Sequence, residues 1–339
     1  MKKKSAAYAR AGVDVDLGNA LKNSLPALVR KTHGPRVLGG IGGFGGLFRA
    51  SFPGMKDPVL VASMDGVGTK LKIAVLAGRH ATVGEDLVNH CVNDIAVMGA
   101  RPLFLLDYIG AGKLDPAVFA QVVSGLARAC RGAGCALLGG ETAQMPGLYH
   151  GADYDLVACI VGVVDRREIL DGSRVRPGDA LVALPSNGLH TNGYTLARSV
   201  LLGKLKLGVN DPLPGTRGTV ADELLRVHRN YEPVLRSLPP RMLHAAAHIT
   251  GGGLPDNLPR VLPPDCRAVI ELRRLRVPPV FRLIQEAGGI SDAEMLRVFN
   301  MGAGMVLAVS ARDAETAARR LRGRVIGRIE RGPRGVEFV

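Results

Sequence analysis

Short apolar runs alternate with amphipathic segments along the chain, and this alternation restricts the fold to the mixed α/β classes. In the first half, the Asp115-Pro116 pair places a helix N-cap before a proline at the first helical position, and apolar side chains then recur at helical spacing as far as Cys130. A second helix opens near Thr82 and ends at Gly99. The predicted strands of this half are 59–64, 103–107, 135–138 and 154–164.

The second half repeats the same alternation. It carries strands at 180–184, 304–309 and 325–329, and helices at 194–202, 220–235 and 313–321. Residues 165–178 are charged and rich in turn-forming residues, so we place a domain boundary there. We therefore predict two mixed α/β (α+β) domains, residues 1–168 and 169–339, each with its own core.

Carboxylates at strand ends are the first candidates for chemistry. Asp65, Asp107 and Glu141 each lie at or just past the end of a predicted strand, where ligands of α/β proteins bind. On the helix that opens near Thr82, Asp86, His90 and Asp94 recur every four residues and so share one face. By itself, a solvated face explains that spacing better than a binding site does. Converging acids would repel one another without a cation, which favours Mg²⁺ holding a nucleotide at Asp65.

Two glycine-rich stretches fail the tests for known phosphate-binding motifs. Residues 39–46 contain a formal GxGxxG, but no strand and helix flank it as a dinucleotide site requires. The stretch 66–70 has Thr before Lys and the wrong glycine spacing for a P-loop. For residues 39–46, a loop closing over phosphates and a simple linker both remain open.

The second half offers two loops suited to anions. Residues 186–193 lie between a predicted strand and a predicted helix, and residues 248–257 contain three consecutive glycines before a short helix. His190, in the first loop, is equally consistent with a proton-transfer role and with a structural one. His244 and His248 are four residues apart but have no third ligand at zinc spacing, so we do not predict zinc.

Composition limits the possible partners. The formal net charge is +14, which is compatible with nucleic acid, yet aromatic residues make up only 4% and Trp is absent. A basic field also suits small phosphorylated molecules, and we favour those over nucleic acid. No apolar run is long enough to span a membrane, and none follows the basic N-terminus as in a secretory signal. The five cysteines form no CxxC pair and indicate reduced thiols of a cytoplasmic protein.

A set of motifs occurs in order over nearly the whole chain: Ala11-Gly12-Val13-Asp14, the glycine stretch 39–46, Asp65–Lys70, Asn93-Asp94 with Gly99–Pro102, Gly139–Ala143, His190–Gly193, His248–Gly253 and Phe299–Met305. This set resembles one family, that of the phosphoribosylformylglycinamidine cyclo-ligases, or AIR synthetases. Thr191 and Met301 stand where Ser and Cys are usual in that family, and neither change removes a charge.

The resemblance implies a cytoplasmic homodimer whose N-terminal domains pair through strands into a barrel-like core, with ATP near that interface. It implies no nucleic-acid or membrane partner. The implied reaction closes the imidazole ring of formylglycinamidine ribonucleotide (FGAM) to give aminoimidazole ribonucleotide (AIR), ADP and phosphate in purine synthesis.

The resemblance also implies roles for individual residues. Asp65, Asp94 and Glu141 would hold Mg²⁺ and ATP, with Lys70 as a cation near the phosphates. His190 would act in catalysis, and Asp14 with the glycine stretch would form a lid. Further nucleotide contacts are expected from Gly66, Gly68, Thr69, Gly42 and Gly43, and substrate contacts from Asn192, Gly193, Thr250, Gly251, Gly252 and Gly253.

Alternatives remain within the same superfamily and outside it. A selenophosphate synthetase would need a reactive cysteine in the glycine stretch 39–46, which has none. A thiamine-phosphate kinase would lack the triple-glycine loop followed by Asn300–Met305, and the related amidotransferase is usually far longer. A basic nucleic-acid-binding protein is the alternative from another class, and salt-sensitive binding without ATPase activity would favour it.

Overall fold

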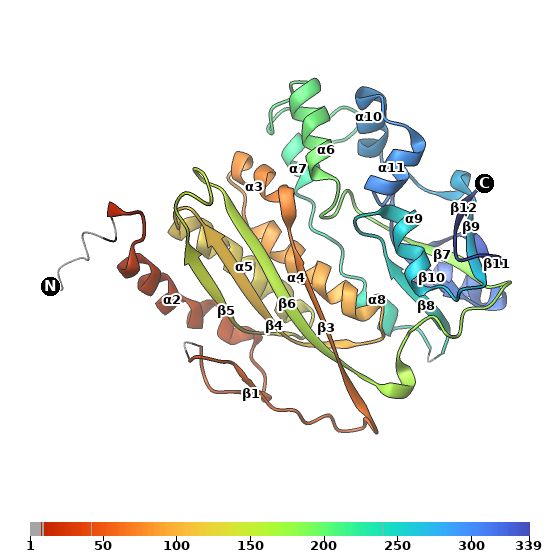
Figure 1. The fold of residues 1–339 in the computed structure, drawn as a ribbon, viewed down its shortest axis with the longest axis horizontal. Coiled ribbons are helices and arrows are strands. Elements are labelled where there is room, and N and C mark those ends of the chain that lie inside the picture. The colour runs from red at the N-terminus through yellow and green to blue at the C-terminus, as the bar shows by residue number, and fades with distance from the viewer. Residues whose placement is uncertain (1–7, 9, 42, 240) are drawn as a thin grey trace. The chain divides into compact units, whose positions relative to one another are not determined.

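The computed structural model describes residues 8, 10–41, 43–239 and 241–339, and its helices and strands form two compact units. The first unit comprises residues 1–95 and 101–166, and the second comprises 96–100 and 167–339. Both are mixed α/β, which confirms the predicted fold class (Figure 1). Among the described residues, no helix has both the length and the apolar character needed to cross a bilayer.

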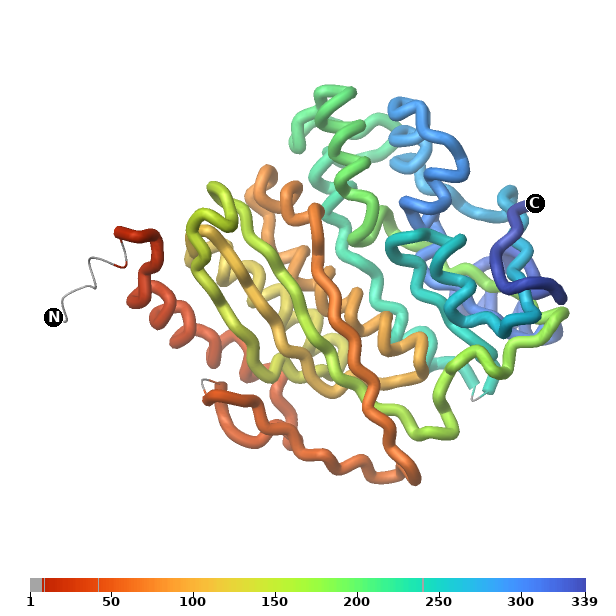
Figure 2. The backbone as a smooth tube through the Cα atoms, viewed as in Figure 1, coloured from red at the N-terminus to blue at the C-terminus, as the bar shows by residue number. Residues whose placement is uncertain are grey.

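The first unit is a four-stranded sheet with helices on one face. The sheet order is β3-β6-β4-β5, in which only β4 and β5 run parallel. Helices α4 and α5 cover one face, and Figure 2 traces their backbones behind the strands. The elements are α2 (Val15–Val29), β1 (Val37–Leu38), β2 (Leu47–Phe48), β3 (Pro58–Gly66), the 3₁₀ turn η2 (Gly68–Lys70), α3 (Leu71–Ala77), α4 (Ala81–Ala96), β4 (Arg101–Ala111), α5 (Pro116–Gly132), β5 (Ala136–Gln144) and β6 (Tyr154–Asp165).

Helix α5 begins where the sequence predicts. The Asp115 carboxylate accepts the backbone N–H groups of Ala117 at 2.7 Å and Val118 at 3.1 Å, and Pro116 occupies the first turn. Helices α4 and α5 then approach so closely that a Cβ at Gly125 would lie 2.0 Å from the carbonyl oxygen of Ala81. Only glycine permits this contact, so the two helices pack as one layer against the sheet.

The other face of this sheet is apolar and exposed. In β3 every second side chain points away from the helices, and Leu60 and Met64 are 62% and 68% exposed. Met64 pairs with Cys159 of β6, which pairs with Leu106 of β4, so these side chains share one face. We call this surface, formed by Leu60, Met64, Leu106 and Cys159, the open sheet face.

The second unit is a six-stranded sheet in the order β12-β9-β11-β7-β10-β8, antiparallel except between β9 and β12. One face packs apolar residues of β7 and β10, such as Val182 and Leu307, against the alanines of α12. The elements are β7 (Ala180–Pro185), α6 (Tyr194–Arg198), the π-helical turn η4 (Ser199–Lys204), α7 (Val220–Leu224), α8 (Glu232–Arg236), β8 (Leu243–His248), α9 (Gly253–Asn257), β9 (Cys266–Ile270), α10 (Pro279–Gly288), α11 (Asp292–Val298), β10 (Ala303–Val309), α12 (Ala314–Arg320), β11 (Arg324–Arg331) and β12 (Gly335–Phe338).

One predicted helix is wrong. Residues 220–235 form two short helices, α7 and α8, rather than one. Thr219 and Asp222 make a capping box that starts α7. Asn230 then accepts the N–H of Glu232 at 2.9 Å, and Pro233 lies in the first turn of α8. A side-chain cap followed by proline starts a new helix, so the continuous apolar spacing was misleading.

A buried ion pair ties the glycine-rich turn after β3 to helix α4. The Lys70 ammonium lies 2.7 Å from an Asp86 carboxylate oxygen, and both side chains are 0% exposed. Burial lowers the pKa of Lys70, and the charge and hydrogen bond of Asp86 oppose that shift. Such a pair holds together only while both partners are present, because a lone buried charge is costly.

We therefore predict strong coupling between these two residues. Lys70→Met or Asp86→Leu alone should lower the free energy of unfolding by about 3–5 kcal/mol, because each leaves a buried charge without its partner. The double variant Lys70→Met/Asp86→Leu should lose much less than the sum of the two. Urea unfolding of the four proteins measures this cycle, and additive losses would contradict a paired role.

Candidate active site

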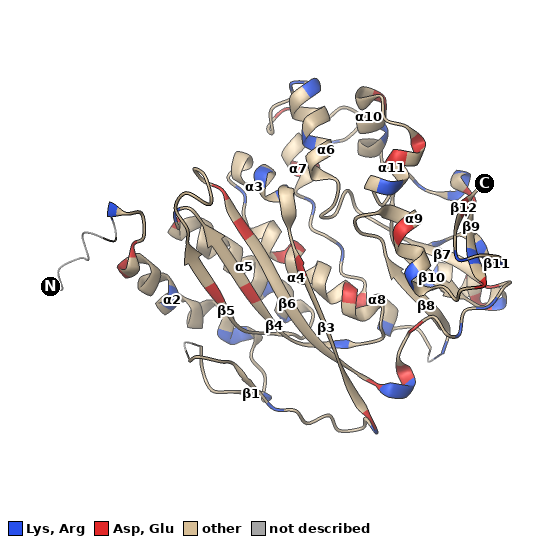
Figure 3. Cartoon of the chain, viewed as in Figure 1, with Lys and Arg blue, Asp and Glu red and all other residues tan. Residues whose placement is uncertain are grey.

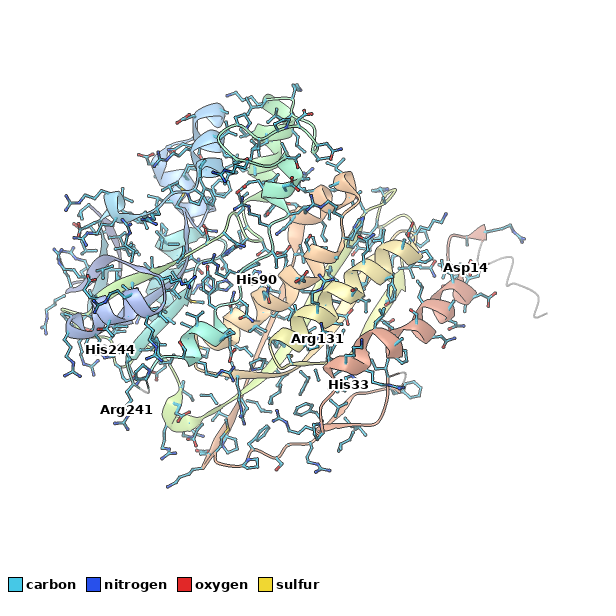
Figure 4. All side chains as sticks on the ribbon, turned by 180° about the vertical axis from the view of Figure 1, so that it is seen from behind. Asp14, His33, His90, Arg131, Arg241 and His244 are labelled. Carbon is cyan, nitrogen blue, oxygen red and sulfur yellow. The ribbon has the colours of Figure 1, made fainter. Side chains whose placement is uncertain are left out.

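The polar face of α4 points toward β3 and the turn that follows it. Asp86 meets Lys70, as described above, and the next residue on that face, His90, lies with Nε2 3.0 Å from Asp65 of β3. One turn further, Asp94 accepts a hydrogen bond from the Ser63 hydroxyl at 3.1 Å. The residues at four-residue spacing therefore form a row of polar contacts within the first unit. This excludes the interpretation that the polar face of α4 is simply exposed to solvent. Figure 4 labels His90 on this helix.

His90 lies among several carboxylates. Burial lowers its pKa, but the hydrogen bond and charge of Asp65, followed by the charges of Asp94 and Asp86, raise the pKa overall. Asp65 contacts the His90 ring directly, and a carboxylate oxygen of Asp94 lies within 4.8 Å of a nitrogen of the same ring. The Asp65 side chain is 41% exposed, and its Oδ1 also accepts the N–H of Gly66 at 2.6 Å.

Asp65 and Asp94 fit a magnesium ion. Each offers carboxylate oxygens, the donor type that Mg²⁺ prefers, and neither is fully buried. Asp86, by contrast, is already neutralised by Lys70. The same helix face therefore has one acid committed to structure and one that remains partly accessible.

Lys70 occupies a different position from the one expected. The resemblance implied a cation near phosphates, but its ammonium is fully buried against Asp86. Thr69 and Gly68 precede it in an exposed turn, where Gly68 has a φ of +67°. In this structure Lys70 positions that turn, while the backbone of the turn remains accessible.

Glu141 does not join Asp65 and Asp94 within one chain. The sheet register aligns Asp65 with Ala158, Asp107 and Gly140, while Glu141 aligns with Tyr108, Val157 and Gly66. Aligned residues point to one side, so Glu141 lies on the open side of the sheet and Asp65 on the helix side. Asp107 and Glu141 are also within their strands, and their predicted place at strand ends is wrong because β4 and β5 continue to Ala111 and Gln144.

The glycine stretch 39–46 joins β1 and β2, which pair antiparallel as a small hairpin. Gly43 is exposed in that connection, and Gly42 lies outside the described residues. Asp14 has a structural role, because its carboxylate accepts the N–H of Leu17 at 3.0 Å as the N-cap of α2. The hairpin is compatible with both interpretations of the stretch.

In the second unit, buried Asn300 organises the loop that carries His190. Its Nδ2 donates to the carbonyl oxygens of Gly188 at 3.0 Å and Leu189 at 3.3 Å. Its Oδ1 accepts the Ser186 hydroxyl at 2.8 Å and the Gly302 N–H at 2.9 Å. One amide thus fixes the turn after β7, although the sequence had shown Asn300 only as part of a family motif.

His190 belongs to a row of three histidines, and the sequence patterns did not predict one of them, His228. His190 stacks on His228 with ring centroids 4.1 Å apart, and His228 Nε2 lies 2.9 Å from His248 Nε2. His228 Nδ1 also lies 3.3 Å from the Thr191 hydroxyl. All three rings are buried. His228 falls in the segment predicted as one long helix, where a lone histidine gave no signal.

Another buried amide, that of Asn257, fixes the conformation of the triple-glycine loop. Asn257 Nδ2 donates to the carbonyl oxygens of Gly253 at 2.8 Å and Gly251 at 3.2 Å, which draws those oxygens inward. Gly252 and Gly253 have φ angles of +91° and +59°, values that favour glycine. A Cβ at Gly251 would lie 3.2 Å from Asn192 Oδ1, so the two predicted substrate loops meet at that point.

Gly193 is needed for packing. A Cβ there would lie 2.2 Å from the Phe299 ring, and its φ is +77°. Thr250, in contrast, contacts Asn257 through its hydroxyl at 3.4 Å and remains half-buried at the start of the glycine loop. Among the expected substrate residues of this unit, Gly193 therefore shapes its loop, whereas Thr250 stays partly accessible in the glycine loop.

Solved structures with this fold include a thiamine-monophosphate kinase and a hydrogenase maturation protein, both at low sequence identity to this chain. The thiamine-monophosphate kinase from Stenotrophomonas maltophilia K279a superposes with a TM-score of 0.69 and 21% identity, covering 94% of this chain and 95% of that one. A hydrogenase maturation protein HypE in complex with ATP gives a TM-score of 0.66 and 19% identity, covering 95% and 91%. At this identity the likeness establishes the fold alone.

Sequence comparison is more specific. The family described as AIR synthase related protein, N-terminal domain, matches residues 51–164, and the corresponding C-terminal domain matches residues 176–339. Proteins called phosphoribosylformylglycinamidine cyclo-ligase are 51% identical in Geotalea daltonii and 50% identical in Citrifermentans bemidjiense, each over 100% of this chain and 99% of the relative. The chain therefore belongs to the phosphoribosylformylglycinamidine cyclo-ligase family.

Proposed function

We propose that this protein closes the imidazole ring of FGAM to give AIR, with ATP converted to ADP and phosphate, as a cytoplasmic enzyme of purine synthesis. The observation that carries the proposal is identity of about half of all residues, over full length, with relatives that bear the cyclo-ligase name. Five cysteines without a disulfide, including buried Cys130 and Cys135, agree with a reducing compartment.

The chemistry begins from a poor leaving group. The formyl oxygen of FGAM is an amide oxygen, and transfer of the γ-phosphoryl group of ATP onto it creates a good leaving group. The amidine nitrogen then attacks the same carbon, and the C–O bond breaks to release phosphate as the five-membered ring closes. In such reactions the protein mainly positions the reactants and neutralises charge.

In the first unit, Asp65 and Asp94 are the residues that would hold Mg²⁺ with ATP. The ion supplies charge neutralisation at the phosphates when bound. His90 fixes the Asp65 carboxylate by its 3.0 Å contact, and Ser63 fixes Asp94. Gly68 and Thr69 lie exposed in the turn that follows and would contact the phosphates through the backbone, whereas the N–H of Gly66 already donates to Asp65.

In the second unit, the glycine loop 250–253 would receive the ribose 5′-phosphate of the substrate. Its carbonyls are drawn inward by Asn257, and the N–H groups of such a loop favour an anion. Asn192 lies against Gly251 and would contact the same substrate. His190 would act in catalysis. Its ring stacks on that of His228, which contacts His248, and this row of rings holds the His190 ring in place.

A homodimer completes the proposal. The open sheet face exposes Leu60 and Met64, and two such faces packed together would bury them in a shared barrel-like core. Glu141 lies on the open side of the sheet, so its expected part in metal binding depends on this dimer.

The activity is tested by incubating the protein with FGAM, ATP and Mg²⁺. We expect aminoimidazole, read by a colorimetric amine assay, to form in equal amount with ADP and only when all three are present. ADP formation that does not depend on FGAM, without aminoimidazole, would contradict the proposed reaction.

The metal role is tested by Asp65→Asn and Asp94→Asn. Each keeps the side-chain shape but removes a charge, so we expect turnover to fall by about a hundredfold or more and the Mg²⁺ concentration for half-maximal rate to rise. Asp115→Asn is the matched control, because asparagine also caps a helix and Asp115 lies outside the site. Wild-type rates in either site variant would refute the assignment.

The dimer is tested by Met64→Asp on the open sheet face. A charge at this position should disfavour pairing of two apolar faces, and sedimentation velocity should show monomers where the wild type shows dimers. Leu76→Asp places the same charge on α3, at an exposed apolar residue outside the open sheet face, and should leave the dimer intact. A wild-type protein that sediments as a monomer would also contradict the proposal.

A further inference from the structure

Five arginines gather around a pocket in the second unit that has no part in the proposed reaction. Two adjoining hollows, of about 530 and 180 Å³, share Arg274, Arg322, Gly323 and Arg324 in their walls. Arg319 of α12 lines one hollow and Arg276 lines the other. We call these two hollows the arginine pocket. Blue segments around β9 and β11 in Figure 3 mark the basic character of this part of the unit.

Most of these arginines have no acidic partner in the described part of the chain, unlike many other arginines of the protein. Arg236 and Arg267, for example, pair with Glu232 and Glu330 at 3.2 and 3.5 Å. Arg274 is bonded to Glu271 at 2.8 Å. The side chains of Arg276, Arg319, Arg322 and Arg324 have no ion pair with any residue that the structure describes.

The balance of charge inside the pocket is strongly positive. Glu315 is the one acidic residue among the described residues that line it, against five arginines. Like charges brought to one concave surface repel one another, and an anionic ligand removes that repulsion. Guanidinium groups bind phosphate oxygens in pairs, which favours phosphate over a simple carboxylate.

The backbone at Arg322 supports a role for its side chain. Its φ is +53°, in the left-handed region that glycine or asparagine adopts more easily than arginine. The residue lies between α12 and β11, in a tight turn where glycine would be less strained. Arginine at this position therefore works against local stability, which is consistent with a side chain kept for binding.

The remaining walls of the pocket are apolar. Pro185, Leu275 and Ile326 line the smaller hollow beside the arginines. Gly302 also lines it, and its N–H bonds to Asn300, the residue that holds the His190 loop. A ligand here would therefore contact the turn that supports the proposed substrate site without sharing its residues.

We propose that the arginine pocket binds a small molecule that carries two or more phosphate groups. Several unpaired guanidinium groups match several phosphates, and the apolar walls suit the non-phosphate part of a ligand such as a nucleotide. Nucleic acid fits less well, because the charge is concentrated in a hollow and none of the described residues that line it is an aromatic residue on which a base could stack.

Inorganic tripolyphosphate is the probe, titrated by calorimetry into the full-length protein in magnesium-free buffer at about 0.15 M salt. We expect the wild type to bind it. Arg322→Gly and the double variant Arg276→Gln/Arg324→Gln should each weaken binding tenfold or more. The matched control is Arg282→Gln/Arg334→Gln, which removes two exposed charges outside the pocket and should bind as the wild type does.

Folding is monitored in the same experiment. Arg322→Gly should melt at or above the wild-type temperature, because glycine accepts the positive φ, so weaker binding could not be attributed to unfolding. The proposal is overturned if the wild type does not bind tripolyphosphate, if either pocket variant binds as tightly as the wild type, or if the control loses as much affinity. Binding of duplex DNA that falls in the pocket variants, without tripolyphosphate binding, would overturn it as well.

Discussion

The first unit depends on the buried ion pair between Lys70 and Asp86. Both charges are completely removed from water, so their separation of 2.7 Å must be maintained for the pair to be tolerated. The pair fixes the turn after β3 against the middle of α4. With that turn in place, Asp65 meets His90, and Ser63 meets Asp94 one helical turn further along.

This arrangement explains how one helix face can serve both folding and the proposed metal binding. Asp86 is neutralised by its lysine and is structural, while Asp94 stays partly accessible beside Asp65. A glycine-rich turn is flexible by nature, and a buried lysine inside it gives the turn a single position. The proposed magnesium and phosphate contacts require that single position, because preorganised charge stabilises transferring phosphoryl groups best.

Short sequence patterns predicted where helices begin and which face of a helix is polar. They could not predict which residues of other elements each side chain would contact. The Asp115 cap marked the start of α5, and the four-residue spacing of α4 marked its polar face. Neither signal could show that Lys70 would be buried against this face, since that contact joins two elements. One sequence does not reveal strand register, so it could not show that Glu141 and Asp65 point to opposite sides of the sheet. His228 came from a segment whose apolar spacing concealed a break between two helices.

We propose that the formyl oxygen of FGAM is phosphorylated and leaves as phosphate. FGAM labelled with ¹⁸O in its formyl group, incubated with this protein, ATP and Mg²⁺, tests this claim by mass spectrometry of the released phosphate. We expect each phosphate formed with AIR to carry one ¹⁸O atom. Unlabelled phosphate, with the ¹⁸O recovered in water, would contradict it.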